Sequence, residues 1–456
     1  MSRPALMFPV LMGGLFGGLL LLGGPPLMIL AVLAVAFGVT IMAQPLRGFL
    51  LFCLIAPVIP WTTVTLGIRV TVSEALLALT WLGVFWQWLM GRLPPLHKGP
   101  TERAMLWFMA WSLVPLVAGQ FVAAEGNGPV NWVRWLLNLS PLFLVPLLAS
   151  QPKQRAQMLL CLLLGYLAML VLSLGVFVLT RDARTMIPIL SSLSYAHPEA
   201  LQDIFGGDFS RMASPWVHPN STGGALLLGV PLAMFYAVAH TGWRRHLGLA
   251  VALGGAAGIV FSGSRGALLS LLLLILWLAY RRAPYAGRTL LVGGLLATAM
   301  LVFYPPAQQR IASLFSSKDV STGVRLEEYK HFPEAMATYP LGIGFKVDPP
   351  ATGAGVFGIS NLWLNQVYKL GLPGGLLFIA ITVAWWREVR QFGDLSRINA
   401  RNAQRIGAVG AMLAALMTGF IDHYFSFTQV LLALFWLNAA IALQETRHPL
   451  APTPRP

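Results

Sequence analysis

The sequence predicts an all-α, polytopic membrane protein, and two observations lead to this fold class. Of the 456 residues, 57% are hydrophobic and only 10% are charged, whereas a typical soluble domain carries about 25% charged residues. The mean hydropathy is correspondingly high, at +0.70. The apolar residues also form runs long enough to cross a bilayer, which takes roughly 20 residues in a helix.

These runs predict about 12–14 transmembrane helices. The count is open because the first two runs are separated only by Gly23-Gly24-Pro25-Pro26, and because the run at 266–280 is short for a span. The N-terminus has no small-residue cleavage site, so it is interpreted as a first span and not as a removed signal peptide. The candidate spans lie near 5–23, 26–43, 47–63, 73–90, 104–122, 131–149, 157–180, 220–239, 247–263, 266–280, 289–304, 362–385, 405–421 and 426–443.

The loops on the two sides of these spans differ in charge. With the N-terminus in the cytoplasm, the inside loops hold most of the 31 Lys and Arg residues but few of the 16 Asp and Glu residues. The positive-inside rule predicts this orientation. The net charge of +15 is therefore a sign of topology and argues against a nucleic-acid partner.

The spans divide the chain into five parts. N-terminal transmembrane helices are expected in 1–180, central ones in 220–304, and C-terminal ones with a cytoplasmic tail in 362–456. The loops 181–219 and 305–361 between them are long and external. Because long connections in compact proteins are often functional, both loops are expected to form ordered caps over an external cavity.

Several kinds of chemistry have no motif in this sequence. There is no P-loop, HExxH helix, nucleophile elbow or DxD pair for a metal-bound nucleotide sugar. Cys53 and Cys161 both lie in apolar runs and predict neither a disulfide framework nor a thiolate metal site. We therefore expect no metal and no cofactor.

Cations gather at the predicted external face. Arg265 stands in the segment FSGSRGALLS between two apolar runs, and a charge at the centre of a spanning helix costs about 2.5–3.5 kcal/mol. The external loops supply Arg211, His218, Asn220 and Arg325. Guanidinium groups bind phosphate oxygens in a bidentate way. This set therefore predicts a diphosphate site that can stabilise a leaving diphosphate without a metal.

Further polar groups flank these cations. Glu327, Glu328, Lys330 and His331 follow Arg325 closely. The segment 221–224, Ser-Thr-Gly-Gly, opens a predicted helix, where free backbone N–H groups favour anions.

Each of these residues also has a simpler structural interpretation. Arg265 could snorkel to the headgroups, and the glycines near it could serve close helix packing. His218 could be part of a helix cap. The remaining groups could be a solvated helix face (Arg325, Glu327, Glu328), a structural histidine (His331) and a cap of the last loop (Asp422, His423).

Three segments in 200–440 together resemble the O-antigen ligase and O-antigen polymerase superfamily. They are Arg211…His218-Pro-Asn220 with Gly223-Gly224; the segment 262–267, Ser-Gly-Ser-Arg-Gly-Ala; and Arg325…Tyr339-Pro-Leu-Gly-Ile-Gly-Phe345, which precedes Asn361, nine further residues and Gly371-Leu-Pro-Gly374.

The resemblance implies a mostly helical membrane glycosyltransferase, similar to C-type glycosyltransferases, that takes its glycan from undecaprenyl diphosphate. It implies that Arg211 and Arg265 bind the donor diphosphate, with His218, Asn220 and Ser264 beside them. Arg325 would bind the diphosphate too, or position the acceptor.

One position departs from the pattern of the ligases. Their proposed catalytic base is a histidine before a polar residue, with Gly-x-x-Gly downstream. Here Ser360 stands before Asn361, with Gly371 and Gly374 downstream, and serine has no suitable pKa for a general base. The base is then expected from Glu327, Glu328 or His331, with His218 and His423 as further candidates.

The sequence therefore predicts a metal-independent glycosyltransferase of the bacterial inner membrane, with its active site facing the periplasm. It would transfer a glycan from undecaprenyl diphosphate to a hydroxyl of a lipid or glycan acceptor. The missing histidine favours an O-antigen or exopolysaccharide polymerase. The alternatives are an O-antigen ligase that uses lipid A core, and a lipid-linked sugar flippase or polysaccharide transporter, which would place charges near the bilayer midplane.

Overall fold

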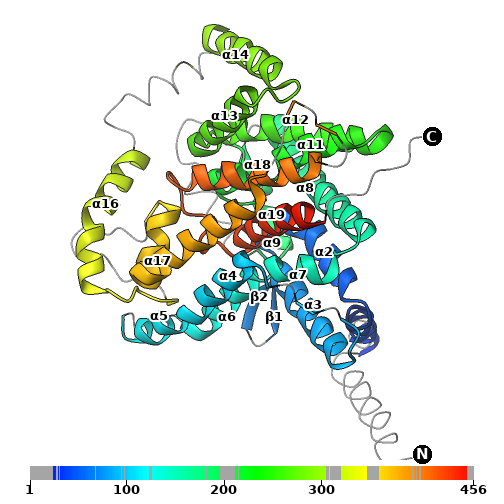
Figure 1. The fold of residues 1–456 in the computed structure, drawn as a ribbon, viewed down its shortest axis with the longest axis vertical. Coiled ribbons are helices and arrows are strands. Elements are labelled where there is room, and N and C mark those ends of the chain that lie inside the picture. The colour runs from blue at the N-terminus through cyan, green and yellow to red at the C-terminus, as the bar shows by residue number, and fades with distance from the viewer. Residues whose placement is uncertain are drawn as a thin grey trace, which may run out of the picture.

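The computed structural model of the chain describes residues 24–448 except 27–28, 30, 67, 94, 97, 123–125, 181, 196–210, 214, 304–307, 309–319, 347–358, 392–394, 397 and 400–401. The described part is a bundle of helices with one small β-hairpin, so the predicted all-α membrane fold is confirmed (Figure 1). The predicted span 5–23 and the end of the tail lie outside the described residues.

The helices follow the predicted apolar runs closely. A first helix covers Gly24–Ala43. The others are α2 (Pro45–Val58), α3 (Val72–Leu89), α4 (Pro100–Trp111), α5 (Leu113–Ala118), η1 (Gly119–Phe121), α6 (Gly128–Leu139), α7 (Pro141–Leu148), α8 (Pro152–Thr180), η2 (Ala183–Met186), α9 (Ile187–Ser192), α11 (Pro219–Ala239), α12 (Gly242–Ser262), α13 (Arg265–Tyr280), α14 (Ala286–Phe303), α16 (Val320–Thr338), α17 (Leu362–Val389), α18 (Ala403–Thr418) and α19 (Gln429–Arg447).

Within the described residues, eight helices are long and apolar enough to cross a membrane, and α2, α13 and α18 are shorter apolar helices. The expected total of 12–14 spans stays a prediction. The expected span 104–122 corresponds to the candidate span Pro100–Phe121, which has a turn at Ser112, whereas the expected span 131–149 is divided at Ser140 into α6 and α7. Pro115 and Pro141 follow these breaks, and proline lacks the N–H that would continue a helical ladder.

The run at 47–63 is helical only to Val58. The chain then forms an antiparallel hairpin of β1 (Thr63–Leu66) and β2 (Ile68–Thr71), with Thr63 opposite Thr71. Thr71 and Glu74 make a capping box that starts α3. The β-branched residues of the hairpin suit an extended backbone, a preference that the apolar count alone does not reveal.

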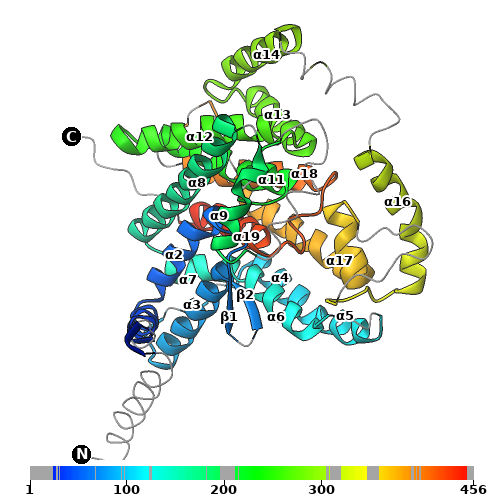
Figure 2. The same cartoon turned by 180° about the vertical axis from the view of Figure 1, so that it is seen from behind.

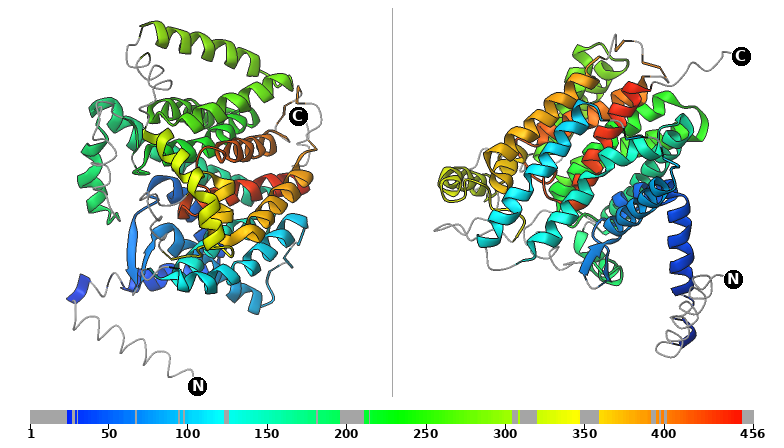
Figure 3. Two further views of the ribbon diagram at one scale, coloured as in Figure 1. Left: turned by 90° about the vertical axis from the view of Figure 1, so that its left-hand side faces the viewer. Right: turned by 60° about the horizontal axis from the view of Figure 1, so that its bottom comes forward.

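Loops far apart in the sequence meet at one end of the bundle, which we call the site end. It comprises residues 59–66, 68–71, 182–195, 211–213, 215–218, 263–264, 339–346, 359–361 and 419–428. Three hydrogen bonds illustrate this: Trp61 Nε1 to Trp216 O at 3.3 Å, Met212 N to Phe261 O at 3.0 Å, and Leu362 N to Gly419 O at 2.7 Å. In Figure 3, the hairpin and α16 both lie away from the end of the bundle that carries the C-terminus.

Buried ion pairs join the helices at the opposite, basic end. Arg447 at the end of α19 contacts Glu102 of α4 and Glu388 of α17, each at 2.6 Å. Arg155 of α8 contacts Glu445 at 2.7 Å. Because an unpaired buried charge is strongly destabilising, these pairs hold the N-terminal helices to the C-terminal ones.

α11 and α19 are the most enclosed of the long helices and are buried over most of their length. α11 packs mainly against α12 and α18 (Figure 2). Its N-terminal turn is therefore held in the interior of the site end, where the predicted polar residues begin.

Candidate functional site

The start of α11 is held close to two other segments. Pro219 is the first helical residue, and the N-cap His218 accepts a hydrogen bond from Asn220 N at its Nδ1, at 3.2 Å. A Cβ on Gly223 would meet Ser264, and one on Gly224 would overlap the ring of Tyr424. These two glycines therefore serve close packing, whereas their segment was expected to offer free N–H groups to an anion.

Arg211 is tied to two of these elements. Its Nε donates to Ser262 O at 2.7 Å, and its Nη2 donates to Asn220 Oδ1 at 2.9 Å. Gly263 ends α12 in the left-handed region, with φ of 61°, and lies against the Arg211 side chain. The predicted pair of Arg211 and Asn220 is thus in direct contact.

Arg265 begins α13 beside this pair. Ser264 is its N-cap, and the Ser264 Oγ accepts from Ala267 N at 3.5 Å. Arg265 is half-buried at the first helical position. Its backbone therefore lies two residues from the Gly263 that contacts Arg211.

α16 has two faces, and they separate the charged residues of the second loop. Glu327 is 43% exposed and binds Lys330 at 2.5 Å, while His331 lies 3.6 Å from Glu334. Arg325 and Glu328 point inward, and Glu328 is only 5% exposed. Of the predicted base candidates on this helix, Glu328 alone faces the site.

Asp422, in the loop between α18 and α19, joins the two arginine segments. Its Oδ2 lies 3.8 Å from Arg325 Nη2, and the nearby Asn220 side chain lowers the pKa of its carboxyl. The His423 N–H also donates to Asp422 Oδ1, at 3.2 Å. Arg211 with Asn220, and Arg325 with Asp422, therefore form two polar pairs at the site end.

The environment of Asp422 changes its acidity. Burial raises its pKa to about 6, although Arg325, the His423 N–H and Asn220 each favour the charged form.

The Arg325 Nε is buried and has no hydrogen-bond partner among the described residues. A buried donor without a partner is costly, so this atom is suited to an anionic ligand.

Ser360 holds the carboxylate of Glu328. Its N–H donates to Glu328 Oε2 at 2.7 Å, and its hydroxyl donates to Oε1 at 3.1 Å. Burial raises the pKa of Glu328, while the Ser360 donors and Arg325 oppose that shift. The carboxylate thus lies within hydrogen-bonding distance of the position where the ligases carry their histidine.

Asn361 brings this pair toward Asp422. Its Oδ1 caps α17 by accepting from Trp363 N and Leu364 N, and its Nδ2 donates to Phe420 O at 3.1 Å. The segment 359–362 is thereby fixed against the loop that carries Asp422. Asn361 has a positioning role and provides no acid or base.

Gly371 and Gly374 belong to the scaffold. Gly371 breaks α17, with φ of 71° and ψ of 173°, and ψ near 180° at positive φ is essentially restricted to glycine. The three backbone carbonyls before the break, those of residues 368–370, accept hydrogen bonds at 2.8–3.0 Å. The donors are Ile343 N, Gly344 N and Trp111 Nε1. A Cβ on Gly374 would overlap Leu370.

The two histidines near the site differ in environment. More than a third of His218 is exposed, yet the surrounding protein lowers its pKa to about 4, with Arg211 and His423 adding further positive charge. His218 is therefore neutral near pH 7 and acts as the helix cap. His423 Nδ1 lies 3.9 Å from Asp422 Oδ1.

From its sequence, Asp422 is expected only to cap a loop. A signal was available, because GFIDHYFS places a carboxylate between two apolar helices on the same predicted side as the arginines. In the described ranges, no three His, Cys, Asp or Glu residues are grouped so that they could hold a metal.

Residues 249–379 match the family model described as O-antigen ligase. The matched region includes Arg265, Arg325, Glu328 and Ser360, whereas Asp422 lies outside it. Among curated proteins, none matches the chain.

Proposed function

Since this chain belongs, through residues 249–379, to the O-antigen ligase/polymerase superfamily, we propose that it transfers a glycan from a polyprenyl diphosphate to an acceptor hydroxyl. The reaction takes place at the site end. The multi-pass helical fold suits this role, because the polyprenyl chain of the donor can lie among the helices while its diphosphate reaches the polar loops.

The arginines bind the donor diphosphate in this proposal. Arg211 is hydrogen-bonded to Asn220, and Arg325 lies beside Asp422. Arg265 begins the helix that follows Gly263. Cations that are held in place before the reaction stabilise the charge that develops on a leaving group. Asp422 orients Arg325, and it is a positioning residue.

Glu328 is the general base. The acceptor oxygen attacks the anomeric carbon, and the bond from that carbon to the diphosphate oxygen breaks. The hydroxyl proton passes to the Glu328 carboxylate, and polyprenyl diphosphate leaves with the bonding electrons. The observation that carries this proposal is the pair of hydrogen bonds from Ser360 to Glu328. They hold the Glu328 carboxylate, which can act as a base, beside the position where the expected histidine is missing.

The acceptor distinguishes two candidate reactions. Polymerisation, with a second lipid-linked repeat unit as acceptor, is favoured because Ser360 replaces the ligase histidine. Ligation to lipid A core is the second candidate, because Glu328 can replace that histidine as a base.

The test uses purified protein in lipid bilayers. It is given a polyprenyl-diphosphate-linked repeat unit alone, and separately the same donor with lipid A core. Release of polyprenyl diphosphate with a ladder of longer glycans identifies a polymerase, and product only with core identifies a ligase. We expect Arg325→Ala to abolish release in either case. If no donor releases polyprenyl diphosphate, the transferase proposal is wrong and transport becomes the better account.

A further inference from the structure

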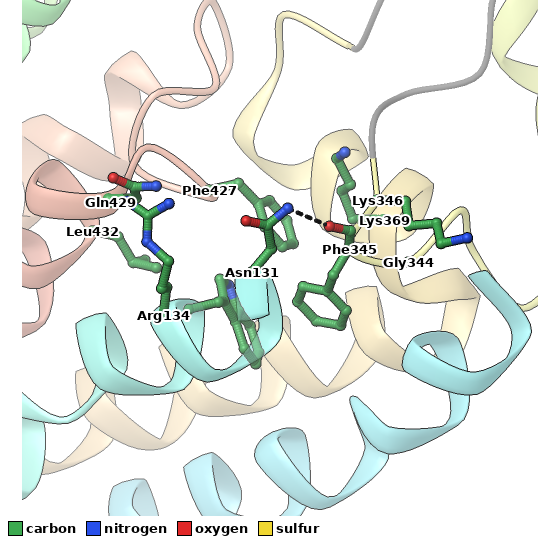
Figure 4. Close-up of a pocket in the computed structure, with 10 residues that line it drawn as sticks. Asn131, Arg134, Gly344, Phe345, Lys346, Lys369, Phe427, Gln429 and Leu432 are labelled. Carbon is green, nitrogen blue, oxygen red and sulfur yellow. Dashed lines mark hydrogen bonds between the residues drawn. The ribbon is translucent and has the colours of Figure 1, made fainter. Parts of the chain in front are cut away.

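The three cations around the pocket shown in Figure 4 are matched by neighbouring groups. This pocket, of about 220 Å³, lies between α6, α17 and the start of α19. Arg134 binds Glu74 at 2.9 Å, and Lys346 Nζ donates to a backbone carbonyl of η1 at 3.0 Å. Lys369 Nζ lies 5.8 Å from the centroid of the Phe427 ring. The protein itself therefore supplies a partner for each cation of this pocket.

At the basic end, the cations fall into two groups. Arg155 and Arg447 are buried in ion pairs with carboxylates, at 2.6–2.7 Å. The second group lies at the corner between α13 and α14, where the segment 281–288 reads Arg-Arg-Ala-Pro-Tyr-Ala-Gly-Arg and all three arginines are exposed. Since α13 begins at the site end, this corner lies at the basic end.

The helices around this corner carry no negative side chain. The sequence has no Asp or Glu between Asp208 and Asp319, so α11, α12, α13 and α14 contain none. In the part of the chain that the structure describes, neither Arg282 nor Arg288 forms an ion pair. Both arginines therefore differ from Arg155 and Arg447, whose charges the protein neutralises.

The corner is ordered by its backbone. Ala283 N donates to Leu278 O at 2.9 Å, and Ala286 N donates to Ala283 O at 3.3 Å. Both alanines are buried, whereas Arg282 and Tyr285 are exposed. These two exposed residues have positive φ, of 57° and 66°, which is uncommon outside glycine. The small side chains thus face inward, and the charged and aromatic ones face outward.

Aromatic rings stand beside the exposed cations. Tyr280 is 84% exposed and Tyr285 is 68% exposed. The guanidinium carbon of Arg288 lies 5.8 Å from the centroid of the Tyr285 ring. Tyrosines at helix ends mark the level of the headgroups in a bilayer, and guanidinium groups at that level can bind a headgroup phosphate.

An apolar stripe continues along α14 from Arg288. Leu291, Val292 and Leu295 are 55–65% exposed. They follow Arg288 by three, four and seven residues, so helical periodicity places them on the same face as this arginine. α14 packs mainly on α13 at the edge of the bundle (Figure 1). A soluble anion needs no such face, whereas a phospholipid can lay an acyl chain along it.

We propose that the corner between α13 and α14 binds an anionic phospholipid of the leaflet at the basic end. Arg282 and Arg288 bind the headgroup phosphate, Tyr280 and Tyr285 lie at the level of the headgroups, and an acyl chain follows the apolar stripe of α14. A zwitterionic headgroup carries its own cation beside the phosphate, so a headgroup with a net negative charge is preferred. The site lies at the end opposite the proposed transfer site and does not depend on the proposed function.

Binding is measured on purified protein that has been stripped of lipid in a neutral detergent. The protein is titrated with phosphatidylglycerol, with phosphatidylcholine of the same acyl chains, and with glycerol 3-phosphate, and native mass spectrometry follows the first bound molecule. We expect phosphatidylglycerol to bind about tenfold more tightly than either of the other two.

Variants then place the lipid on the corner. Arg282→Gln/Arg288→Gln should weaken phosphatidylglycerol binding about 25-fold, because each cation near an anionic headgroup contributes about fivefold to the affinity. The matched control, Arg103→Gln/Lys153→Gln, removes two exposed cations elsewhere at the basic end and should leave this binding intact.

Leu291→Ser/Leu295→Ser tests the apolar stripe. It should also weaken phosphatidylglycerol binding, because the acyl chain loses apolar contact. Unfolding midpoints measured without lipid should stay native in all three variants, since every replaced side chain is exposed.

Four results would overturn the proposal. They are native phosphatidylglycerol binding by Arg282→Gln/Arg288→Gln, phosphatidylcholine that binds as tightly as phosphatidylglycerol, and an equal loss of binding in the control, which would show a general effect of charge. The fourth is glycerol 3-phosphate that binds as tightly as the lipid, which would reduce the corner to a phosphate site.

Discussion

Asp422 is the residue that links the separate parts of the site, and its burial has a measurable consequence. Its pKa of about 6 in the folded protein lies above the value of 3.8 for an unperturbed aspartate. A carboxyl whose pKa is raised on folding contributes stability below the unfolded pKa and loses that contribution as the pH rises through the folded pKa. Asp422 therefore lowers the stability of the native protein at neutral pH.

Asp422→Asn removes this titration. Relative to the native protein, the variant should gain stability as the pH rises from about 4 to about 7, by up to about 3 kcal/mol at 1.36 kcal/mol per pKa unit. It should also lose transfer activity, because Arg325 loses the anion that orients it. Unfolding midpoints measured across that pH range check the first effect, and a difference between the two proteins that does not change with pH would contradict it.

At the scale of single residues, the sequence predicted which side chains belong to the site better than it predicted which of them are in contact. Arg211 and Asn220 were expected in one site and are hydrogen-bonded, because they are close in the chain at the start of a helix. The contact of Arg325 with Asp422 joins segments far apart in the sequence, and no local pattern encodes such a pair. The two faces of α16 could have been separated by helical periodicity, which places Glu328 on the same face as Arg325, three residues earlier, and away from Glu327.

At the scale of elements, the apolar runs gave most helix positions, while breaks inside the helices needed backbone detail. α17 shows why, since its run reads as one span although Gly371 interrupts it. The break is accommodated because the segment 341–344 packs against it and supplies hydrogen-bond donors. A tertiary contact therefore decides a local conformation.

Gly371→Ala should destabilise the protein by about 1–3 kcal/mol from backbone strain alone. A Cβ would also lie 2.9 Å from Pro340 O, which adds to the effect. Gly293→Ala is the matched control, because it lies in α14 with no atom within 4 Å of the added Cβ and alanine favours helices. Thermal unfolding in detergent compares the two, and an unchanged midpoint for Gly371→Ala would refute the role given to the break.

For the whole molecule, the helices place the proposed catalytic groups at one end and the basic loops at the other. The positive-inside rule predicts that the basic end lies in the cytoplasm. The charge pattern was readable in the sequence because each short loop carries its own charges. The meeting of the loops at the site end depends on packing between distant helices such as α11 and α18, so it required the structure.

Single cysteines test this orientation. In a background with Cys53 and Cys161 replaced by alanine, Ser192→Cys lies in α9 at the site end and Lys153→Cys lies at the basic end, both at exposed positions. A membrane-impermeant maleimide should label Ser192→Cys in intact spheroplasts, and Lys153→Cys only in inverted vesicles. The reverse pattern would contradict the orientation and place the site in the cytoplasm.

The central claim is that Glu328, held by Ser360, is the base of glycosyl transfer. The most direct measurement is the rate of polyprenyl diphosphate release by Glu328→Gln, alone and combined with Ser360→His. We expect Glu328→Gln to lower the rate by about 10²–10⁴, the usual contribution of general base catalysis. Ser360→His should restore part of that loss by supplying a base at the neighbouring position. A Glu328→Gln variant that releases polyprenyl diphosphate at the native rate would contradict the account, whatever the effect of the added histidine.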